Sequence, residues 1–211
     1  MARSVSRSLT SSEGLWAELQ AEMRMCRRCL SAGFSVTPAA VFSGPVSACF
    51  MIVGQAPGAS EAETGRPFNG SSGQRLFGWL AQAGWDEGVF RGTQYVTAIT
   101  KCYPGKSSSG KGDRAPTREE QALCAPFLKR ELDLVQPRVV VPVGSLAVQR
   151  FLGQTRLSDV VGTVIDRPDD RCIVPLPHPS GVSLWLNRSE NQERVRQALA
   201  HLQRLHPQLQ A

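Results

Sequence analysis

Four of the six cysteines are spaced in a way that suits a metal centre. Cys26 and Cys29 form a Cys-x-x-Cys pair, and this short spacer lets two thiolates reach the same metal centre. Cys102 and Cys124 follow much later, on either side of a loop rich in lysine, serine and glycine. Four thiolates from distant segments suit either a zinc site or a [4Fe–4S] cluster, and composition alone does not separate the two.

A second group of residues with special chemistry or conformation follows four apolar runs of the sequence. The turns Gly54–Gly58 and Gly144-Ser145 contain glycines, which allow a backbone to approach a ligand closely. Lys101-Cys102 follows another run, and His178 follows the last one. His178 stands between two prolines, which fix the backbone around a side chain that can donate or accept a hydrogen bond. These residues predict a binding site, provided that the fold brings them together.

The order of sequence patterns predicts a fold that does so. Apolar, β-rich runs alternate with patterns of helical period, as expected of a βαβ series around a mainly parallel sheet. Ligand sites of such open α/β sheets lie beyond the carboxyl ends of the strands, so the four segments are expected to meet in one crevice. The predicted strands are Ala48–Val53, Tyr95–Thr100, Arg138–Val143 and Arg171–Leu176, and the predicted helices lie near residues 12–25, 71–83, 117–135, 145–152 and 188–204.

Composition and charge restrict the class of protein. The 211 residues are 41% hydrophobic, and no apolar run approaches the roughly 20 residues that a membrane span requires. A segment rich in serine and arginine, residues 1–12, is predicted to be a flexible tail, and residues 13–206 a single domain. Because the tail lacks the apolar stretch of a secretory signal, we expect a cytoplasmic protein without disulfides. The net charge of +6 favours a polyanionic partner, with nucleic acid foremost.

Taken in chain order, these motifs resemble the iron–sulfur branch of the uracil-DNA glycosylase superfamily, closest to family 4. The resemblance spans about residues 24–200 and rests on Gly54-Gln55-Ala56-Pro57-Gly58, Gly65-Arg66-Pro67-Phe68-Asn69-Gly70, Lys101-Cys102 and His178-Pro179-Ser180. It implies a three-layer α/β fold with a central, mainly parallel four-stranded sheet flanked by helices. It also implies a structural [4Fe–4S] cluster held by Cys26, Cys29, Cys102 and Cys124. The implied partner is damaged or single-stranded DNA, and the expected state is a monomer.

The resemblance assigns tasks to individual residues. A DNA glycosylase must extrude the target base, hold it, and stabilise negative charge on the departing base. His178 matches the histidine that hydrogen-bonds the base carbonyl, and Phe68 matches the position that stacks on the base. Gln55 and Glu61 are the other candidate catalytic residues. The remaining expected contacts to the base, the sugar or a phosphate are Gly54, Ala56, Pro57, Gly58, Ala98 and Ser180.

Two positions depart from the family 4 pattern. By register with Lys101-Cys102, Ala98 stands where family 4 has an asparagine that reads the uracil edge, and an alanine has no polar group for this. Gln55 replaces the usual glutamate. Ala56 stands where the best-known glycosylase family has the aspartate that activates water. Glu61 matches an acidic position of the family and is therefore expected to orient water or to stabilise the oxocarbenium ion.

Uracil is the leading substrate on this interpretation, and two alternatives remain. The first is an enzyme of the same fold that excises another base, such as hypoxanthine or xanthine, because Ala98 leaves room. The second is a damaged-DNA-binding protein without hydrolytic activity. The loop Gly105–Gly112 is too poor in apolar residues to be expected to order itself. The basic residues around it, expected to contact the DNA backbone, are Lys101, Lys106, Lys111, Arg114 and Arg118.

Overall fold

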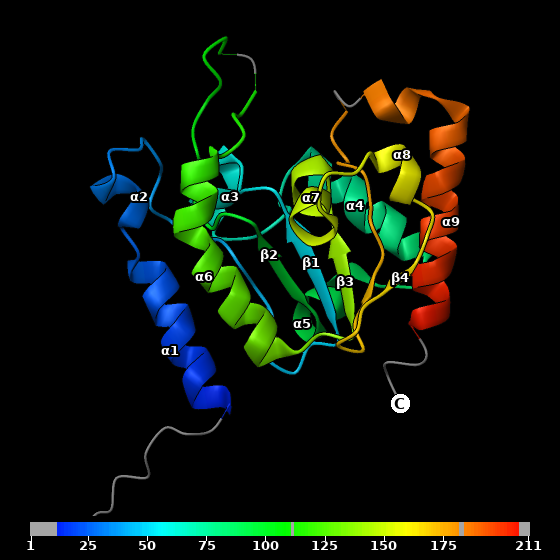
Figure 1. Cartoon of the computed structure of the whole chain (residues 1–211), viewed down its shortest axis with the longest axis horizontal. Coiled ribbons are helices and arrows are strands. Elements are labelled where there is room, and N and C mark those ends of the chain that lie inside the picture. Colours follow the sequence, from blue (N-terminus) through cyan, green and yellow to red (C-terminus); the bar gives the residue numbers. More distant parts are fainter. Residues whose placement is uncertain (1–11, 111, 182–183, 207–211) are drawn as a thin grey trace, which may run out of the picture.

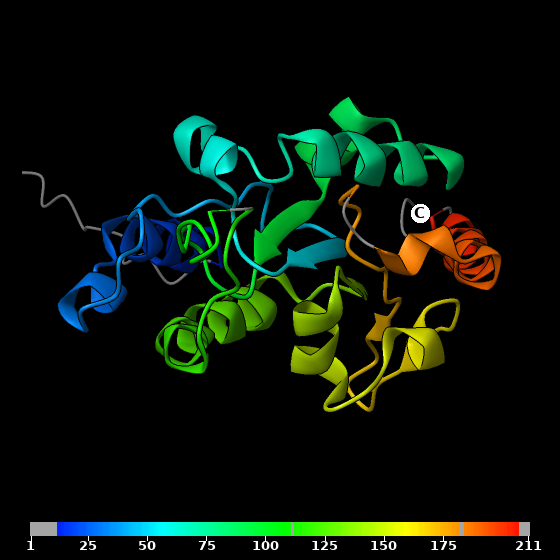
Figure 2. The same cartoon turned by 90° about the horizontal axis from the view of Figure 1, so that it is seen from above.

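The computed structural model describes residues 12–110, 112–181 and 184–206. Helices lie on both faces of a central five-stranded sheet, as Figures 1 and 2 show. The mainly parallel α/β fold predicted from the sequence is therefore confirmed. The predicted tail, residues 1–12, falls outside the described residues except for Ser12, at which α1 begins.

The sheet has the strand order β2-β1-β3-β5-β4. Its strands are β1 (Phe50–Gly54), β2 (Tyr95–Ala98), β3 (Val139–Pro142), β4 (Ile165–Asp166) and β5 (Cys172–Ile173). Neighbouring strands are parallel, except that β4 runs antiparallel to β5. The prediction of four strands was thus one strand short. A strand of two residues, one of them the exposed Asp166, has no apolar pattern by which the sequence could reveal it.

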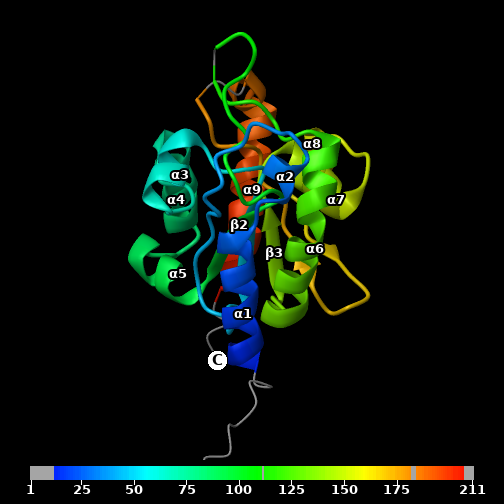
Figure 3. The same cartoon turned by 90° about the vertical axis from the view of Figure 1, so that its left-hand side faces the viewer.

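The central strands are apolar throughout because helices bury both of their faces. Side chains alternate along β1, so that Phe50 and Ile52 enter one core while Met51 and Val53 enter the other. The first core includes side chains of α4 (Ser71–Gln82), α5 (Glu87–Thr93) and α9 (Ser189–Leu205), and the second includes side chains of α1 (Ser12–Met25), α6 (Arg118–Val135) and α7 (Ser145–Leu152). Figure 3 shows α4 and α5 on one side of the sheet and α6 and α7 on the other.

The last predicted strand is shorter than expected. Only Cys172–Ile173 forms a strand, although the amides of Val174 and Leu176 still donate to carbonyls of β3. Pro175 and Pro177 interrupt the ladder because proline has no amide hydrogen to donate. The segment therefore continues beside β3 and ends at His178, at the carboxyl edge of the sheet.

The five predicted helices are present as α1, α4, α6, α7 and α9. The sequence did not predict the shorter helices, which are too short to display a helical period: α2 (Arg28–Ser31), α3 (Ala59–Thr64), α5, α8 (Leu157–Val160) and the 3-10 helix η1 (Leu184–Asn187). Among the described residues, no helix combines the length and apolar character needed to cross a bilayer.

The loop between β2 and α6 extends beyond the carboxyl edge of the sheet, at the top of Figure 1. Its glycine-rich part was expected not to order itself, and this expectation was wrong for the described residues. The amide of Arg114 donates to the carbonyl of Gly105 at 3.0 Å, and that of Ser107 to the carbonyl of Gly112 at 3.0 Å. Backbone hydrogen bonds, which need no apolar surface, close the loop into a hairpin-like arm.

Candidate active site

A cavity of about 690 Å³ opens at the carboxyl ends of β1 and β2. This volume lies within the range of about 300–1,000 Å³ that small-molecule sites occupy. The turn after β1 and the segment at His178 meet here, whereas Cys102 belongs to a second cavity and Gly144 packs behind His178. All the predicted catalytic and substrate-binding residues line the first cavity: Gly54, Gln55, Ala56, Pro57, Gly58, Glu61, Phe68, Ala98, His178 and Ser180.

Phe68 contributes an aromatic ring to this cavity. Its backbone has a φ of +50°, a left-handed conformation that is uncommon for a residue with a side chain. Two glycines make room for it. A Cβ on Gly54 would lie 3.1 Å from the Phe68 ring atom Cζ, and one on Gly73 would lie 1.7 Å from the Phe68 carbonyl oxygen. A side chain at Gly73 is therefore incompatible with this conformation of Phe68.

Glu61 ties the turn after β1 to the Phe68 loop. Its Oε2 accepts a hydrogen bond from the amide of Gly58 at 2.6 Å, and its Oε1 accepts one from the amide of Phe68. Burial raises the pKa of Glu61, and the two amide donors act in the opposite direction. The role expected for Glu61 in orienting water stays a prediction, but both of its carboxylate oxygens are engaged with the backbone.

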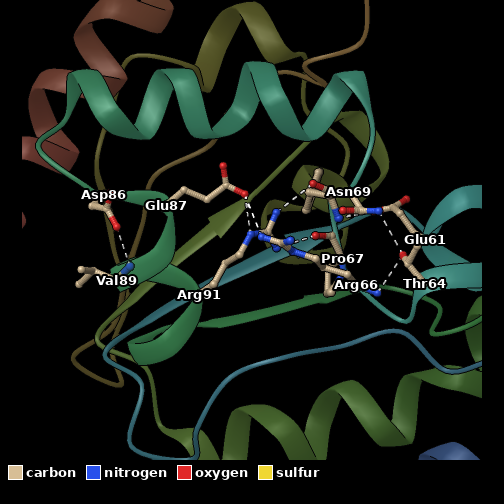
Figure 4. Close-up of polar contacts among 10 residues, drawn as sticks. Glu61, Thr64, Arg66, Pro67, Asn69, Asp86, Glu87, Val89 and Arg91 are labelled. Atoms are coloured by element: carbon tan, nitrogen blue, oxygen red, sulfur yellow. Dashed lines mark hydrogen bonds and ion pairs between the residues drawn. The ribbon is translucent and has the colours of Figure 1, made fainter.

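Arg91, on α5, holds the other side of the Phe68 peptide. Its guanidinium donates to the carbonyl of Pro67 at 2.8 Å and to that of Phe68 at 3.0 Å. Figure 4 shows Arg91 between Pro67 and Glu87, whose carboxylate lies 2.8 Å from Arg91 Nε. The guanidinium also lies over the ring of Phe77, 4.0 Å from its centroid. The strained loop is thus fixed from its amide side by Glu61 and from its carbonyl side by Arg91.

The hydrogen bonding of His178 determines which ring nitrogen carries the proton. The amide of Ser180 donates to Nδ1 at 3.2 Å, so the hydrogen of the neutral imidazole resides on Nε2. Burial lowers the pKa of His178, which keeps the ring neutral at pH 7. Gly144 lies directly behind the ring, since a Cβ there would be 3.3 Å from the Cβ of His178. His178 is therefore a neutral imidazole with Nε2–H as its hydrogen-bond donor.

Lys101 was expected to contact the DNA backbone, and the structure shows that this was wrong. The side chain is 2% exposed, with Nζ 2.6 Å from Oε2 of Glu131 and 2.5 Å from the carbonyl oxygen of Ala98. Glu131 is itself fully buried and accepts hydrogen bonds from the hydroxyls of Tyr95 and Thr97. The charge of Lys101 suggested a residue on the surface. The sequence could not show that the tertiary fold brings Glu131 of α6 to this lysine in the interior.

The other basic residues predicted to contact DNA have different surroundings. Lys106 and Arg118 are exposed, with Lys106 Nζ 3.5 Å from a carboxylate oxygen of Asp113. Arg114 pairs with Glu120 at 2.6 Å, within the capping region of α6. Lys111 lies outside the described residues. Contact of Lys106, Arg114 and Arg118 with DNA stays a prediction.

Asp113 is a residue of the cavity that the sequence reading missed. Its Oδ2 would lie 3.2 Å from a Cβ on Gly58, and its Oδ1 accepts a hydrogen bond from the hydroxyl of Tyr103 at 2.8 Å. The only signal available in the sequence was an acidic residue next to Arg114 at the end of a glycine-rich loop. Among the other polar residues that line the cavity, Ser60, Ser71, Ser72 and Thr97 were not predicted.

The four cysteines of the predicted metal site line a second cavity, together with Thr100 and Lys101. Cys26 follows α1, Cys29 lies in α2, Cys102 follows β2 and Cys124 lies in α6. Three separate segments of the chain therefore converge here, as the spacing of the cysteines required. Within the described ranges, no three cysteine, histidine or acidic side chains lie close enough to form a ready-made site for a single metal ion.

The residues that line this cavity fit a negatively charged group held by sulfur atoms. Burial raises the pKa of Cys102 to about 12, and the proximity of Cys124, Cys26 and Cys29 adds to the effect. The hydroxyl of Thr100, which lines the same cavity, is buried and has no hydrogen-bond partner among the described residues. Arg27 and Arg28 also line the cavity, so positive charge is available near the sulfur atoms. Sulfur ligands, an unsatisfied donor and nearby cations suit a negatively charged iron–sulfur cluster.

Comparison with known proteins finds a matching family model and several curated relatives. The family model described as uracil DNA glycosylase superfamily matches residues 41–203, a range that contains every predicted catalytic and substrate-binding residue. The "Type-4 uracil-DNA glycosylase" of Thermotoga maritima is 33% identical over 161 residues, which cover 75% of this chain and 78% of that protein.

Two further relatives show that the similarity is not confined to one type. The "Type-4 uracil-DNA glycosylase" of Pyrobaculum aerophilum is 38% identical over 117 residues, 53% of this chain and only about half, 55%, of that protein. The "Type-5 uracil-DNA glycosylase" of the same organism is 35% identical over 159 residues, 69% of this chain and 67% of that protein.

Proposed function

Because this chain belongs to the uracil-DNA glycosylase superfamily, we propose that it excises a deaminated base from DNA by hydrolysing the N-glycosidic bond, with uracil the first candidate. The relatives named above are uracil-DNA glycosylases of type 4 and type 5. The observation that carries the proposal is the neutral imidazole of His178, which lines a cavity with room for a base and donates through Nε2.

His178 stabilises the departing base in this mechanism. When the glycosidic bond breaks, negative charge accumulates on the carbonyl oxygens of the base while the sugar becomes an oxocarbenium ion. A hydrogen-bond donor aimed at such an oxygen lowers the barrier by about 2.7–4 kcal/mol. Because the Ser180 amide occupies Nδ1, the Nε2–H group of His178 is the donor that meets the developing charge.

Phe68 stacks on the extruded base. A base stacked on an aromatic ring is stabilised by about 1–3 kcal/mol. Glu61 and Arg91 already fix the two peptide groups of Phe68, so little conformational entropy is lost when the base binds. Gln55 and the backbone of Gly54–Gly58 contact the base or the sugar, and Ser180 a phosphate.

Asp113 orients the attacking water and opposes the positive charge of the sugar. Ala56 cannot take this role, and both oxygens of Glu61 are engaged by backbone amides. The Oδ2 atom of Asp113 is directed towards Gly58 in the cavity, while Tyr103 holds its Oδ1. A carboxylate in this position favours the oxocarbenium ion electrostatically and accepts a hydrogen bond from water.

A second candidate function is excision of a larger base such as hypoxanthine or xanthine. It is favoured by Ala98, which lines the cavity and offers no polar group to read the edge of uracil. The volume of about 690 Å³ also exceeds what one pyrimidine fills. Loss of paired contacts to the base edge relaxes discrimination by roughly 1–3 kcal/mol.

We also propose that Cys26, Cys29, Cys102 and Cys124 hold a [4Fe–4S] cluster. Their shared cavity, the Thr100 hydroxyl and the nearby Arg27 and Arg28 support it. When bound, the cluster supplies a structural cross-link between α1–α2, the segment after β2, and α6. Because cysteines bind iron as thiolates, loading would release protons, including the one that burial keeps on Cys102.

A single-turnover assay on labelled oligonucleotides tests the proposed activity. Uracil, hypoxanthine or xanthine is placed in single- and double-stranded DNA, and the wild type is compared with Ala98→Asn, which introduces an amide that can read the uracil edge. Uracil excision by the wild type, made more selective by Ala98→Asn, supports the first candidate. Excision of hypoxanthine or xanthine alone supports the second. DNA that is bound but never cleaved at the glycosidic bond overturns both and leaves a non-catalytic damage-binding protein.

A further inference from the structure

Thr100 is a polar side chain of the cysteine cavity that the mechanism does not use. It is 4% exposed and lines the cavity together with Cys102 and Cys124. Its Oγ1 atom is buried and forms no hydrogen bond with any described residue. A buried hydroxyl without a partner costs about 1–3 kcal/mol, and such groups are uncommon in native folds. A partner that the chain itself does not supply is the simplest account of this hydroxyl.

Hydrogen bonds hold the backbone at Thr100 in place. The amide of Ile99 donates to the carbonyl of Gly54 at 2.9 Å, and the amide of Thr100 donates to that of Gln55 at 3.3 Å. These bonds attach the segment to the turn after β1, on the side of the base-binding cavity. The amide of Lys101 instead interacts with the sulfur of Cys124. Thr100 is thus attached to the turn through its backbone, and it lines the cavity of the cysteines.

We propose that the Thr100 hydroxyl donates a hydrogen bond to a sulfur atom of the iron–sulfur cluster, an inference that rests on the cluster proposed above. Cluster sulfurs carry negative charge and accept hydrogen bonds, and Thr100 lines the same cavity as the four cysteines proposed to hold the cluster. Hydrogen bonds to the sulfurs are among the factors that set the reduction potential of a cluster. A donor stabilises the reduced state, which carries one more electron, and therefore raises the potential. Thr100 is on this account a residue that tunes the cluster, with no part in base excision.

The test is a redox titration of the purified holoprotein, reduced stepwise with dithionite and followed by visible absorption and electron paramagnetic resonance. Thr100→Val replaces the hydroxyl with a methyl group of similar size, and Thr100→Ser keeps the hydroxyl. Thr100→Ala differs from Thr100→Ser only by that hydroxyl, so this pair decides the question if Thr100→Val does not fold. Thr163→Val, on an exposed loop, is the matched control.

The expected result is a midpoint potential shifted to more negative values in Thr100→Val and Thr100→Ala, with Thr100→Ser and Thr163→Val close to the wild type. Uracil excision should be unchanged in all four variants. Equal potentials in Thr100→Ser and Thr100→Ala would overturn the inference, with a buried water as the partner of the hydroxyl instead. Protein that holds no iron and sulfide would overturn the cluster and this inference together. If the variants show these shifts in potential but the wild type excises no base, only the proposed activity is contradicted.

Discussion

Residues in and just after β2 line both the base-binding cavity and the cysteine cavity, and the two cavities differ in how their polar groups are satisfied. In the first, backbone amides occupy both oxygens of Glu61 and the Nδ1 atom of His178. In the second, burial raises the pKa of Cys102 to about 12, and the Thr100 hydroxyl has no partner among the described residues. Residues of the chain itself satisfy the polar groups of the base-binding cavity. The cysteine cavity instead has buried polar groups that suit a bound cofactor.

The largest effect on excision is expected at the donor of the base-binding cavity. Replacing His178 by alanine should lower the single-turnover rate on uracil by about 10²–10³-fold, because one donor to the developing anion is lost. DNA affinity should change little, since the effect is confined to the transition state. His201→Ala, on the outer part of α9, is the matched control and should excise at the wild-type rate. A His178→Ala variant that retains wild-type rates would remove the argument for a catalytic site in this cavity.

The pH dependence of excision provides a second test of the same site. Since burial lowers the pKa of His178 below its ordinary value of 6.5, excision should stay constant from pH 8 down to pH 6.5 and fall only at lower pH. There, protonation puts a hydrogen on Nδ1, facing the amide of Ser180. Stability should fall in the same direction, because the unfolded chain binds this proton at a higher pH than the folded one. A rate profile that already declines above pH 6.5 would contradict a neutral His178.

A smaller effect is expected from the group that holds the stacking loop. Arg91→Ala removes the donors to the carbonyls of Pro67 and Phe68 and should reduce excision by roughly tenfold, mainly through weaker binding of DNA that contains the damaged base. Arg66→Ala is the matched control, because Arg66 also pairs with Glu87 but is exposed. For both variants, the single-turnover rate of excision is measured as a function of enzyme concentration, which separates weaker DNA binding from slower chemistry. Equal losses in the two variants would show that Glu87, and not the Phe68 peptide, is what matters.

The smallest effect on the catalytic rate is expected at the cysteine cavity. Cys26→Ala should lose the iron and the broad visible absorption while the folded fraction still excises uracil, because the cluster serves structure. Thermal stability should fall, since the cross-link between α1–α2 and α6 is lost. Cys49→Ala, outside the cavity, should keep its iron. A wild type with stoichiometric zinc and no iron would contradict the cluster and favour a four-cysteine zinc site.

The sequence predicted those features that depend on local patterns. The buried strands β1 and β3 appear as continuous apolar runs, and Thr117 and Glu120 mark the start of α6. The order of strands and turns then placed His178 beside Gly54, because parallel strands share one carboxyl edge. The grouping of the four cysteines followed from the family resemblance and from the spacing of the first pair.

Other features depend on contacts between segments far apart in the sequence. Lys101 was read as a surface cation, although Glu131 of α6 neutralises it in the interior. The sequence did not predict Asp113 as a site residue, because it reaches the cavity only where its loop folds back towards Gly58. The hydrogen bond from the amide of Phe68 to Glu61 joins two loops, and the sequence could not show it. The strand β4 has too few residues to carry any pattern. The cytoplasmic location and the monomeric state stay predictions.

The central claim is that His178 stabilises the anion of the leaving base, and comparison of two leaving groups tests it most directly. Single-turnover rates would be measured for uracil and 5-fluorouracil in the same oligonucleotide, with the wild type and His178→Ala. The fluorinated base leaves as a more stable anion and needs less help from a donor. The account predicts that His178→Ala slows removal of uracil much more than removal of 5-fluorouracil. Equal losses for the two bases would contradict leaving-group stabilisation and assign His178 a role in binding.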